Sequence, residues 1–193
     1  MTIVPVRVGR RGFLGSVAAS CLPLLWTARS FAQDHGRIRP PVAPPNLPLI
    51  RNDGTATTLG ALLDHRATAL QVMFTACTTT CPIQGAIFER VQKLLPDQIA
   101  RGVQLVSLSV DPRRDTAPTL ASWLRRFHAR SGWIAAAPRE QDVEQVREFT
   151  GKGRSASDNH STQVQILNRE GLLVWRTGEL PEAEEIAALL RRV

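Results

Sequence analysis

Two cysteines, Cys77 and Cys81, stand four residues apart in the segment Phe74-Thr-Ala-Cys-Thr-Thr-Thr-Cys-Pro82. The apolar run 69–74 before them predicts a strand, and the apolar spacing over 82–95 predicts a helix. The cysteines therefore fall at a predicted helix start, where unpaired N–H groups and the helix dipole stabilise a thiolate. Because the thiolate is both the nucleophile and the metal ligand, the pair is suited to closing a disulfide or to binding one soft metal ion.

A packing role and a structural role are the alternatives for this pair. A disulfide across four residues closes a very small loop, so it gains little entropy for the fold as a whole. A closed structural zinc site normally has four ligands. The chain has three cysteines, and the third, Cys21, lies near the N-terminus. Since cysteine usage follows reactivity more than packing, we expect a chemical role for Cys77 and Cys81.

The first 32 residues have the three-part layout of an export signal. A basic stretch contains Arg10-Arg11-Gly-Phe-Leu, an apolar run covers 13–26, and Ser30-Phe-Ala32 resembles a cleavage site. The paired arginines resemble the twin-arginine signal, with a general secretory signal as the alternative. We expect a periplasmic protein that loses Cys21 on cleavage, and that is attached to the membrane only if the signal stays uncleaved as an anchor.

The charge distribution argues against nucleic acid as a partner. The chain has a net charge of +7, and four of its arginines lie in residues 1–32, which contain no acidic residue. Removing this segment lowers the net charge to +3, and no block of Lys or Arg follows it. The pairs Arg113-Arg114 and Arg125-Arg126 are interpreted as solvated faces, with docking to an acidic protein as the alternative.

Residues 33–48 form a proline-rich segment, and residues 49–193 form the predicted folded domain. Five prolines within nine residues favour an extended conformation, so this segment is predicted to be a tether or an ordered strap along the domain surface. In the domain, predicted strands alternate with predicted helices, and the segments 163–167 and 172–175 predict a β-hairpin followed by a helix over 182–192. This order predicts an α/β fold, a three-layer sandwich with a mixed central sheet.

The cysteine segment resembles the Sco/SenC family of copper chaperones, and the resemblance continues along roughly 47–193. The segment from Ser107 to Thr116 resembles the family's Ser-Val-Asp-Pro-x-x-Asp-Thr motif. Gly132-Trp133 resembles its Gly-Trp pair, and Asn159-His160-Ser161 resembles its Asp-His-Ser. The family fold implied by this resemblance is thioredoxin-like.

The resemblance also implies a copper site. Its ligands would be Cys77, Cys81 and His160, with Asp111 as a nearby carboxylate that orients them. Soft thiolates suit Cu(I), and an imidazole also tolerates Cu(II). Three protein ligands leave the ion open to a partner protein.

Two functions follow from this site. The first is a metallochaperone, not an enzyme, that delivers copper to the binuclear copper site of cytochrome c oxidase or to another copper acceptor. The second is a thiol–disulfide oxidoreductase that cycles Cys77 and Cys81 and keeps a partner's cysteines reduced for metal loading. A periplasmic copper donor or a thiol reductase would be a further partner. A peroxide-reducing protein and a plain interaction module are minor alternatives.

Overall fold

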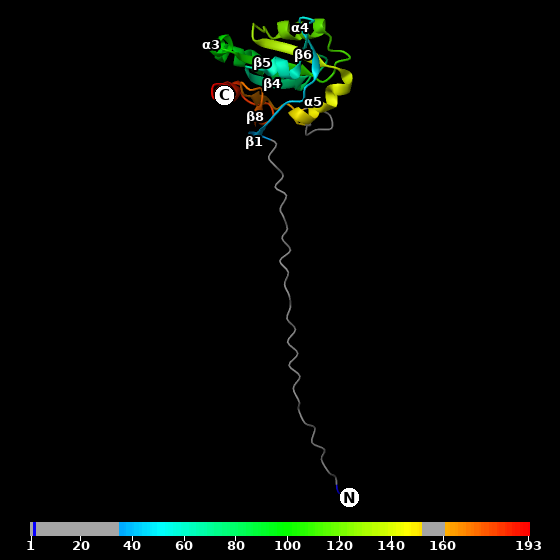
Figure 1. Cartoon of the computed structure of the whole chain (residues 1–193), viewed down its shortest axis with the longest axis vertical. Coiled ribbons are helices and arrows are strands. Elements are labelled where there is room, and N and C mark those ends of the chain that lie inside the picture. The colour runs from blue at the N-terminus through cyan, green and yellow to red at the C-terminus, as the bar shows by residue number, and fades with distance from the viewer. Residues whose placement is uncertain (1, 3–34, 152–160) are drawn as a thin grey trace. The chain divides into compact units, whose positions relative to one another are not determined.

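A single eight-stranded sheet forms the centre of the folded unit (Figure 1). The structure is a computed structural model that describes residue 2 and residues 35–151 and 161–193. The predicted export signal and His160 therefore lie outside the described residues. The strand order is β1-β8-β7-β4-β5-β6-β2-β3. The strands are β1 Gly36–Val42, β2 Pro48–Arg51, β3 Ala56–Thr58, β4 Ala67–Met73, β5 Val103–Ser109, β6 Trp133–Pro138, β7 Gln165–Leu167 and β8 Leu173–Arg176.

The centre of the sheet is parallel and its flanks are antiparallel. Strand β5 pairs in parallel with β4 on one side and β6 on the other. Strands β7 and β2 join this centre in the antiparallel sense, so the sheet is mixed, as predicted. Every residue of β4 and β5 is buried, which is expected of parallel strands that are covered on both faces.

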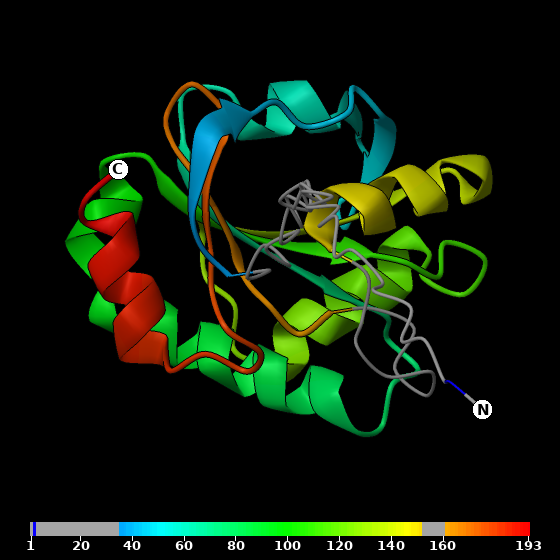
Figure 2. The ribbon, with the colours of Figure 1, turned by 90° about the horizontal axis from the view of Figure 1, so that it is seen from below.

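Helices cover both faces of the sheet and complete three layers (Figure 2). One apolar core joins the sheet to α2, α4 and α6, and a second joins the opposite face to α1 and α5. The predicted α/β three-layer sandwich is confirmed. The helices are α1 Leu59–Leu63, α2 Thr80–Leu94, α3 Pro96–Ala100, α4 Ala117–Arg126, α5 Val143–Thr150 and α6 Ala183–Leu190, with a 3₁₀ turn at Glu140–Asp142. In the part of the chain that the structure describes, no helix has the length and apolar character needed to cross a membrane.

The proline-rich segment 33–48 contains a strand of the sheet. Strand β1 pairs with β8 at one edge of the sheet, and Leu47, just before β2, is buried. The ordered strap is therefore the alternative that the structure shows, and the folded unit begins before residue 49. Edge position explains how Pro40 and Pro41 fit, because proline lacks the N–H that a central strand needs.

Helix α2, which carries Cys81, packs closely on Phe127 at the C-terminal end of α4. Gly85 lies one turn after Cys81, and a Cβ atom there would overlap the ring of Phe127, the residue that follows α4. Further along α2, the Gln92 side chain donates to the carbonyl of His128 at 2.8 Å and accepts from the N–H of Arg130 at 3.0 Å. Helix α2 is thus held against the end of α4 and the residues after it, by close packing in its second turn and by partly buried hydrogen bonds in its last turn.

We predict that Gly85→Ala lowers the free energy of unfolding by about 1–3 kcal/mol, because the added methyl group overpacks the contact with Phe127. Gly178→Ala is the matched control, since a Cβ atom there meets no atom within 4 Å. Urea unfolding of both variants measures the difference. Equal unfolding midpoints for the two variants would contradict the close packing of α2 on α4.

Candidate metal centre

The two cysteines lie where β4 ends and α2 begins. Both side chains are thiols, and both are buried: Cys77 is 7% exposed and Cys81 is fully inaccessible. The N–H of Cys77 donates to the carbonyl of Phe74 at 3.1 Å, which turns the chain just after the strand. Cys77 therefore lies in the loop between β4 and α2, and Cys81 lies in the first turn of the helix.

The sulfur of Cys77 caps α2. Thr79 precedes the helix, but its side chain makes no capping hydrogen bond. Instead, the N–H of Cys81 donates to Cys77 Sγ at 3.3 Å. The hydroxyl groups of Thr79 and Thr80 lie 3.8 and 4.0 Å from the same sulfur. A helix start stabilises negative charge, so this arrangement favours the thiolate form of Cys77.

The two thiols differ strongly in acidity. Burial raises the pKa of Cys77, but hydrogen bonds from Cys81 and Thr79 outweigh it and lower the pKa to about 7. For Cys81, burial is the main cause of a pKa raised far above that of a free cysteine, and the hydrogen bond with Cys77 adds to it. At neutral pH, Cys77 is thus a partly ionised nucleophile and Cys81 a protonated thiol. Because metal ligands must be deprotonated, a metal ion bound by both sulfurs displaces the proton of Cys81.

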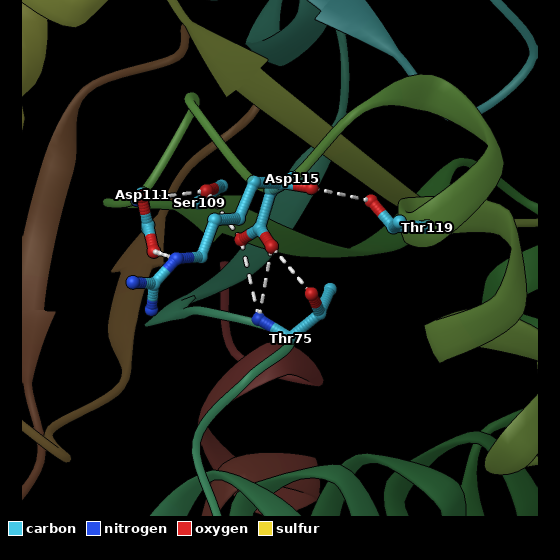
Figure 3. Close-up of polar contacts among 6 residues, drawn as sticks. Thr75, Ser109, Asp111, Asp115 and Thr119 are labelled. Carbon is cyan, nitrogen blue, oxygen red and sulfur yellow. Dashed lines mark hydrogen bonds and ion pairs between the residues drawn. The ribbon is translucent and has the colours of Figure 1, made fainter.

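A buried carboxylate, Asp115, holds the loop that leads to Cys77 (Figure 3). It accepts from the N–H of Thr75 at 3.1 and 3.2 Å, from the Thr75 hydroxyl at 2.5 Å and from the Ser109 hydroxyl at 2.6 Å. Asp115 is 2% exposed. The carboxylate therefore ties the end of β4 to the end of β5, two residues before the first cysteine.

The hydrogen bond and the ion pair of Asp111 lie within its own loop. Its carboxylate lies 3.8 Å from Arg114 Nε, and its N–H donates to Ser109 Oγ at 3.0 Å. The contacts that reach the cysteine loop come from Asp115, which belongs to the same motif but was not singled out from the sequence. A role of Asp111 toward His160 stays a prediction, because His160 lies outside the described residues.

The chain directly after position 160 is fixed by Glu179. Its carboxylate accepts from the Ser161 hydroxyl at 2.9 Å, from the N–H of Thr162 at 2.6 Å and from the Thr162 hydroxyl. In addition, Gln84 Nε2 donates to the Thr162 carbonyl at 3.3 Å. Gln84 comes from α2, three residues after Cys81, so the segment that follows His160 is bonded to the helix that carries the second cysteine. Sequence reasoning missed both side chains.

The histidines of the described chain are His35, His65 and His128, all exposed and in three different parts of the sequence. His65 is exposed and lies 3.2 Å from Asp64, and His128 lies 3.4 Å from Glu89. Within residues 35–151 and 161–193, no three side chains of His, Cys, Asp or Glu gather as a metal site. The described part of the predicted site is therefore the cysteine pair, and its third predicted ligand lies at position 160.

We predict that alkylation of Cys77 by iodoacetamide rises with pH through a midpoint of about 7 in the reduced protein. Below that pH the thiol dominates, and above it the reactive thiolate dominates. Mass spectrometry of the peptide with both cysteines separates Cys77 from Cys81, which is expected to stay unmodified over the same range. A midpoint near 8.5, the ordinary value for cysteine, would contradict the stabilised thiolate.

We predict that Asp115→Asn lowers the free energy of unfolding by about 1–3 kcal/mol, because buried donors of Thr75 and Ser109 lose an acceptor. It also speeds amide hydrogen exchange at Thr75. The matched control is Asp111→Asn. It removes a carboxylate from the same loop, and that carboxylate makes one long ion pair, with Arg114. Equal exchange rates at Thr75 in both variants would contradict the role of Asp115.

Comparison with known proteins identifies relatives along most of the chain. The family model SCO1/SenC matches residues 46–193. The human protein SCO2 homolog, mitochondrial, is 27% identical over 151 residues, which is 68% of this chain and 57% of the human protein. The chain thus spans little more than half of that relative.

Solved structures agree with the fold. Bradyrhizobium japonicum ScoI with copper bound has a TM-score of 0.63 at 23% identity, covering 78% of this chain and 99% of ScoI. BsSco is a member of the Sco family of cytochrome c oxidase assembly proteins in which a disulfide switch has been identified. It has a TM-score of 0.62 at 18% identity, covering 78% of this chain and 95% of BsSco. The family-model match over most of the chain, together with the thioredoxin-like architecture shared with these structures, shows that the chain belongs to the SCO1/SenC family.

Proposed function

We propose that this protein binds one copper ion through Cys77, Cys81 and His160 and delivers it during assembly of cytochrome c oxidase. The observation that carries the proposal is the cysteine pair at the start of α2, with one thiolate stabilised and one thiol buried beside it. Copper-bound ScoI and the assembly role stated for BsSco support this reading.

The chemistry of the pair fits Cu(I) as cargo. Two sulfur ligands suit a soft monovalent ion, and an imidazole adds a nitrogen ligand that also accepts Cu(II). The hydrogen bonds of Glu179 and Gln84 fix Ser161 and Thr162, the two residues that follow His160 in the sequence, and connect them to α2. A three-ligand site keeps a coordination position for the acceptor, such as the copper-site subunit of the oxidase. The location that we propose is the periplasm, reached through the twin-arginine signal.

Thiol–disulfide exchange is the second candidate function, and the unequal acidity of the two thiols favours it. The Cys77 thiolate would attack a partner disulfide, and one partner sulfur would leave as thiolate. Cys81, once deprotonated, would then attack Cys77 and release the partner as a dithiol. Two electrons pass to the partner, and Cys77–Cys81 becomes a disulfide that an external dithiol must reduce again. The same two cysteines would then carry out disulfide exchange and copper binding at different times.

We predict that the reduced full-length protein binds one Cu(I) per chain. All proteins in this experiment carry Cys21→Ser, which removes the third cysteine. Cys77→Ser/Cys81→Ser is expected to abolish binding, because no soft ligand remains. His160→Ala is expected to weaken binding at least 10-fold against a competing Cu(I) chelator, since one of three ligands is lost. His65→Ala is the matched control, an exposed histidine outside the proposed site.

Copper retained at full stoichiometry in the double cysteine variant would overturn the copper site. Unchanged affinity in His160→Ala would remove His160 from it. A third measurement separates the two functions: disulfide exchange of the His160→Ala variant with a small disulfide is expected to keep the wild-type rate, because that reaction uses the sulfurs alone.

A further inference from the structure

A surface cavity of about 480 Å³ lies between the C-terminal end of α6, the edge strand β1 and its neighbour β8. Its volume falls in the range of small-molecule sites, roughly 300–1,000 Å³. No residue of the cysteine loop or of the Asp115 loop lines it. The cavity is therefore separate from the proposed copper site, and its function has to be argued from its own lining.

The inner part of the cavity is apolar. Trp175 of β8 is paired directly with Ile166 of β7 on one side and with Arg37 of β1 on the other. Directly opposed residues in an antiparallel sheet project from the same face, so these three side chains form one row across the edge of the sheet. The other apolar residues of the lining are Ile38, Pro41, Val174, Leu189 and Val193. This surface suits a hydrocarbon or another apolar body.

The rim of the cavity carries excess positive charge. Arg37, Arg39 and Arg192 all line it, all are exposed, and none makes a hydrogen bond or ion pair through its side chain within the described residues. Glu170 is the one acidic side chain in the lining. Arg37 and Arg39 stand two residues apart on β1, which places both on the same side of the strand.

Three exposed guanidinium groups against one acidic side chain leave the rim of the cavity with a net positive charge. Three other arginines of the described surface pair with a carboxylate: Arg90 with Glu184, Arg113 with Glu140, and Arg139 with Asp142. Guanidinium groups bind carboxylate and phosphate oxygens through paired hydrogen bonds. The lining therefore combines an apolar floor with unused anion-binding groups at its rim.

We propose that this cavity binds an amphipathic anion, with its apolar body against Trp175, Ile166 and Leu189 and its carboxylate or phosphate group at the arginines. A fatty-acid-like molecule in solution and an anionic lipid in a bilayer share this chemistry. Binding does not involve Cys77 or Cys81, so it is independent of the proposed copper function and remains in the double cysteine variant.

The test compares two probes of equal chain length, octanoate and neutral 1-octanol, on the full-length protein. Methyl NMR spectra report where each probe binds, through Ile166, Val174 and Leu189 in the cavity. Ile50 is the control methyl, since it lines a different hollow beside Pro138. We expect saturable shifts at the three cavity methyls, with octanoate binding at least 10-fold more tightly than octanol.

The charge requirement is tested with Arg37→Gln/Arg39→Gln. These substitutions remove two positive charges and keep polar side chains at the rim. This double variant is expected to lose the preference for octanoate. Arg101→Gln, an exposed arginine after α3 that does not line the cavity, is expected to keep it. Equal affinity for the two probes, shifts centred on Ile50, or an unchanged preference in the double variant would each overturn the proposal.

A third arm identifies the source of the anion once octanoate binding is established. Vesicles of phosphatidylcholine with phosphatidylglycerol are added to the octanoate complex of the wild-type protein and of the double arginine variant. Displacement that depends on the arginines supports a bilayer lipid as the occupant. Retained octanoate supports a free carboxylate amphiphile.

Discussion

The buried carboxylate of Asp115 is the interaction on which the geometry of the cysteine loop depends. It makes no ion pair among the described residues, so hydrogen bonds must offset the cost of burying its charge. Thr75 and Ser109 supply them, and in doing so they fix the end of β4 against the end of β5. The loop then has little freedom in the two residues before Cys77, and the sulfur of Cys77 meets the first turn of α2.

Two parts of the chain flank the proposed site, and each is held by its own contacts. On the cysteine side, Asp115 holds the loop and the close contact of Gly85 with Phe127 holds the helix. On the other side, the Glu179 carboxylate gathers the donors of Ser161 and Thr162, and Gln84 connects this segment to α2. Asp115 and Glu179 accept hydrogen bonds from backbone N–H groups and so orient the chain around the proposed site. Neither carboxylate is proposed as a metal ligand.

Much of the fold was predictable from sequence because its central elements have strong patterns. The buried strand β4, the helix after the cysteines and the C-terminal hairpin and helix were all predicted close to their observed bounds. Strand β6 was missed because Trp133–Pro138 is rich in alanine and has no alternating pattern. Strand β1 was predicted as tether or strap, since prolines hide an edge strand that gains its partners from β8.

The chemistry of the site was predictable where it depends on residue type and local spacing. It was less predictable where it depends on contacts between residues far apart in the sequence. The cysteine spacing and the helix start are local, so the sequence indicates both. The choice between Asp111 and Asp115 depends on which carboxylate meets a loop 40 residues away. Glu179 contacts Thr162 across 17 residues, and Gln84 contacts Thr162 across 78. Tertiary pairing of this kind leaves no periodic signal in one sequence.

X-ray absorption at the copper edge of the Cu(I)-loaded full-length protein tests the central claim most directly. The account predicts two sulfur neighbours and one imidazole nitrogen around each copper ion, with the imidazole signal absent in His160→Ala and the sulfur signal absent in Cys77→Ser/Cys81→Ser. A spectrum with nitrogen and oxygen neighbours alone, or a sulfur signal that survives in the double cysteine variant, would contradict it.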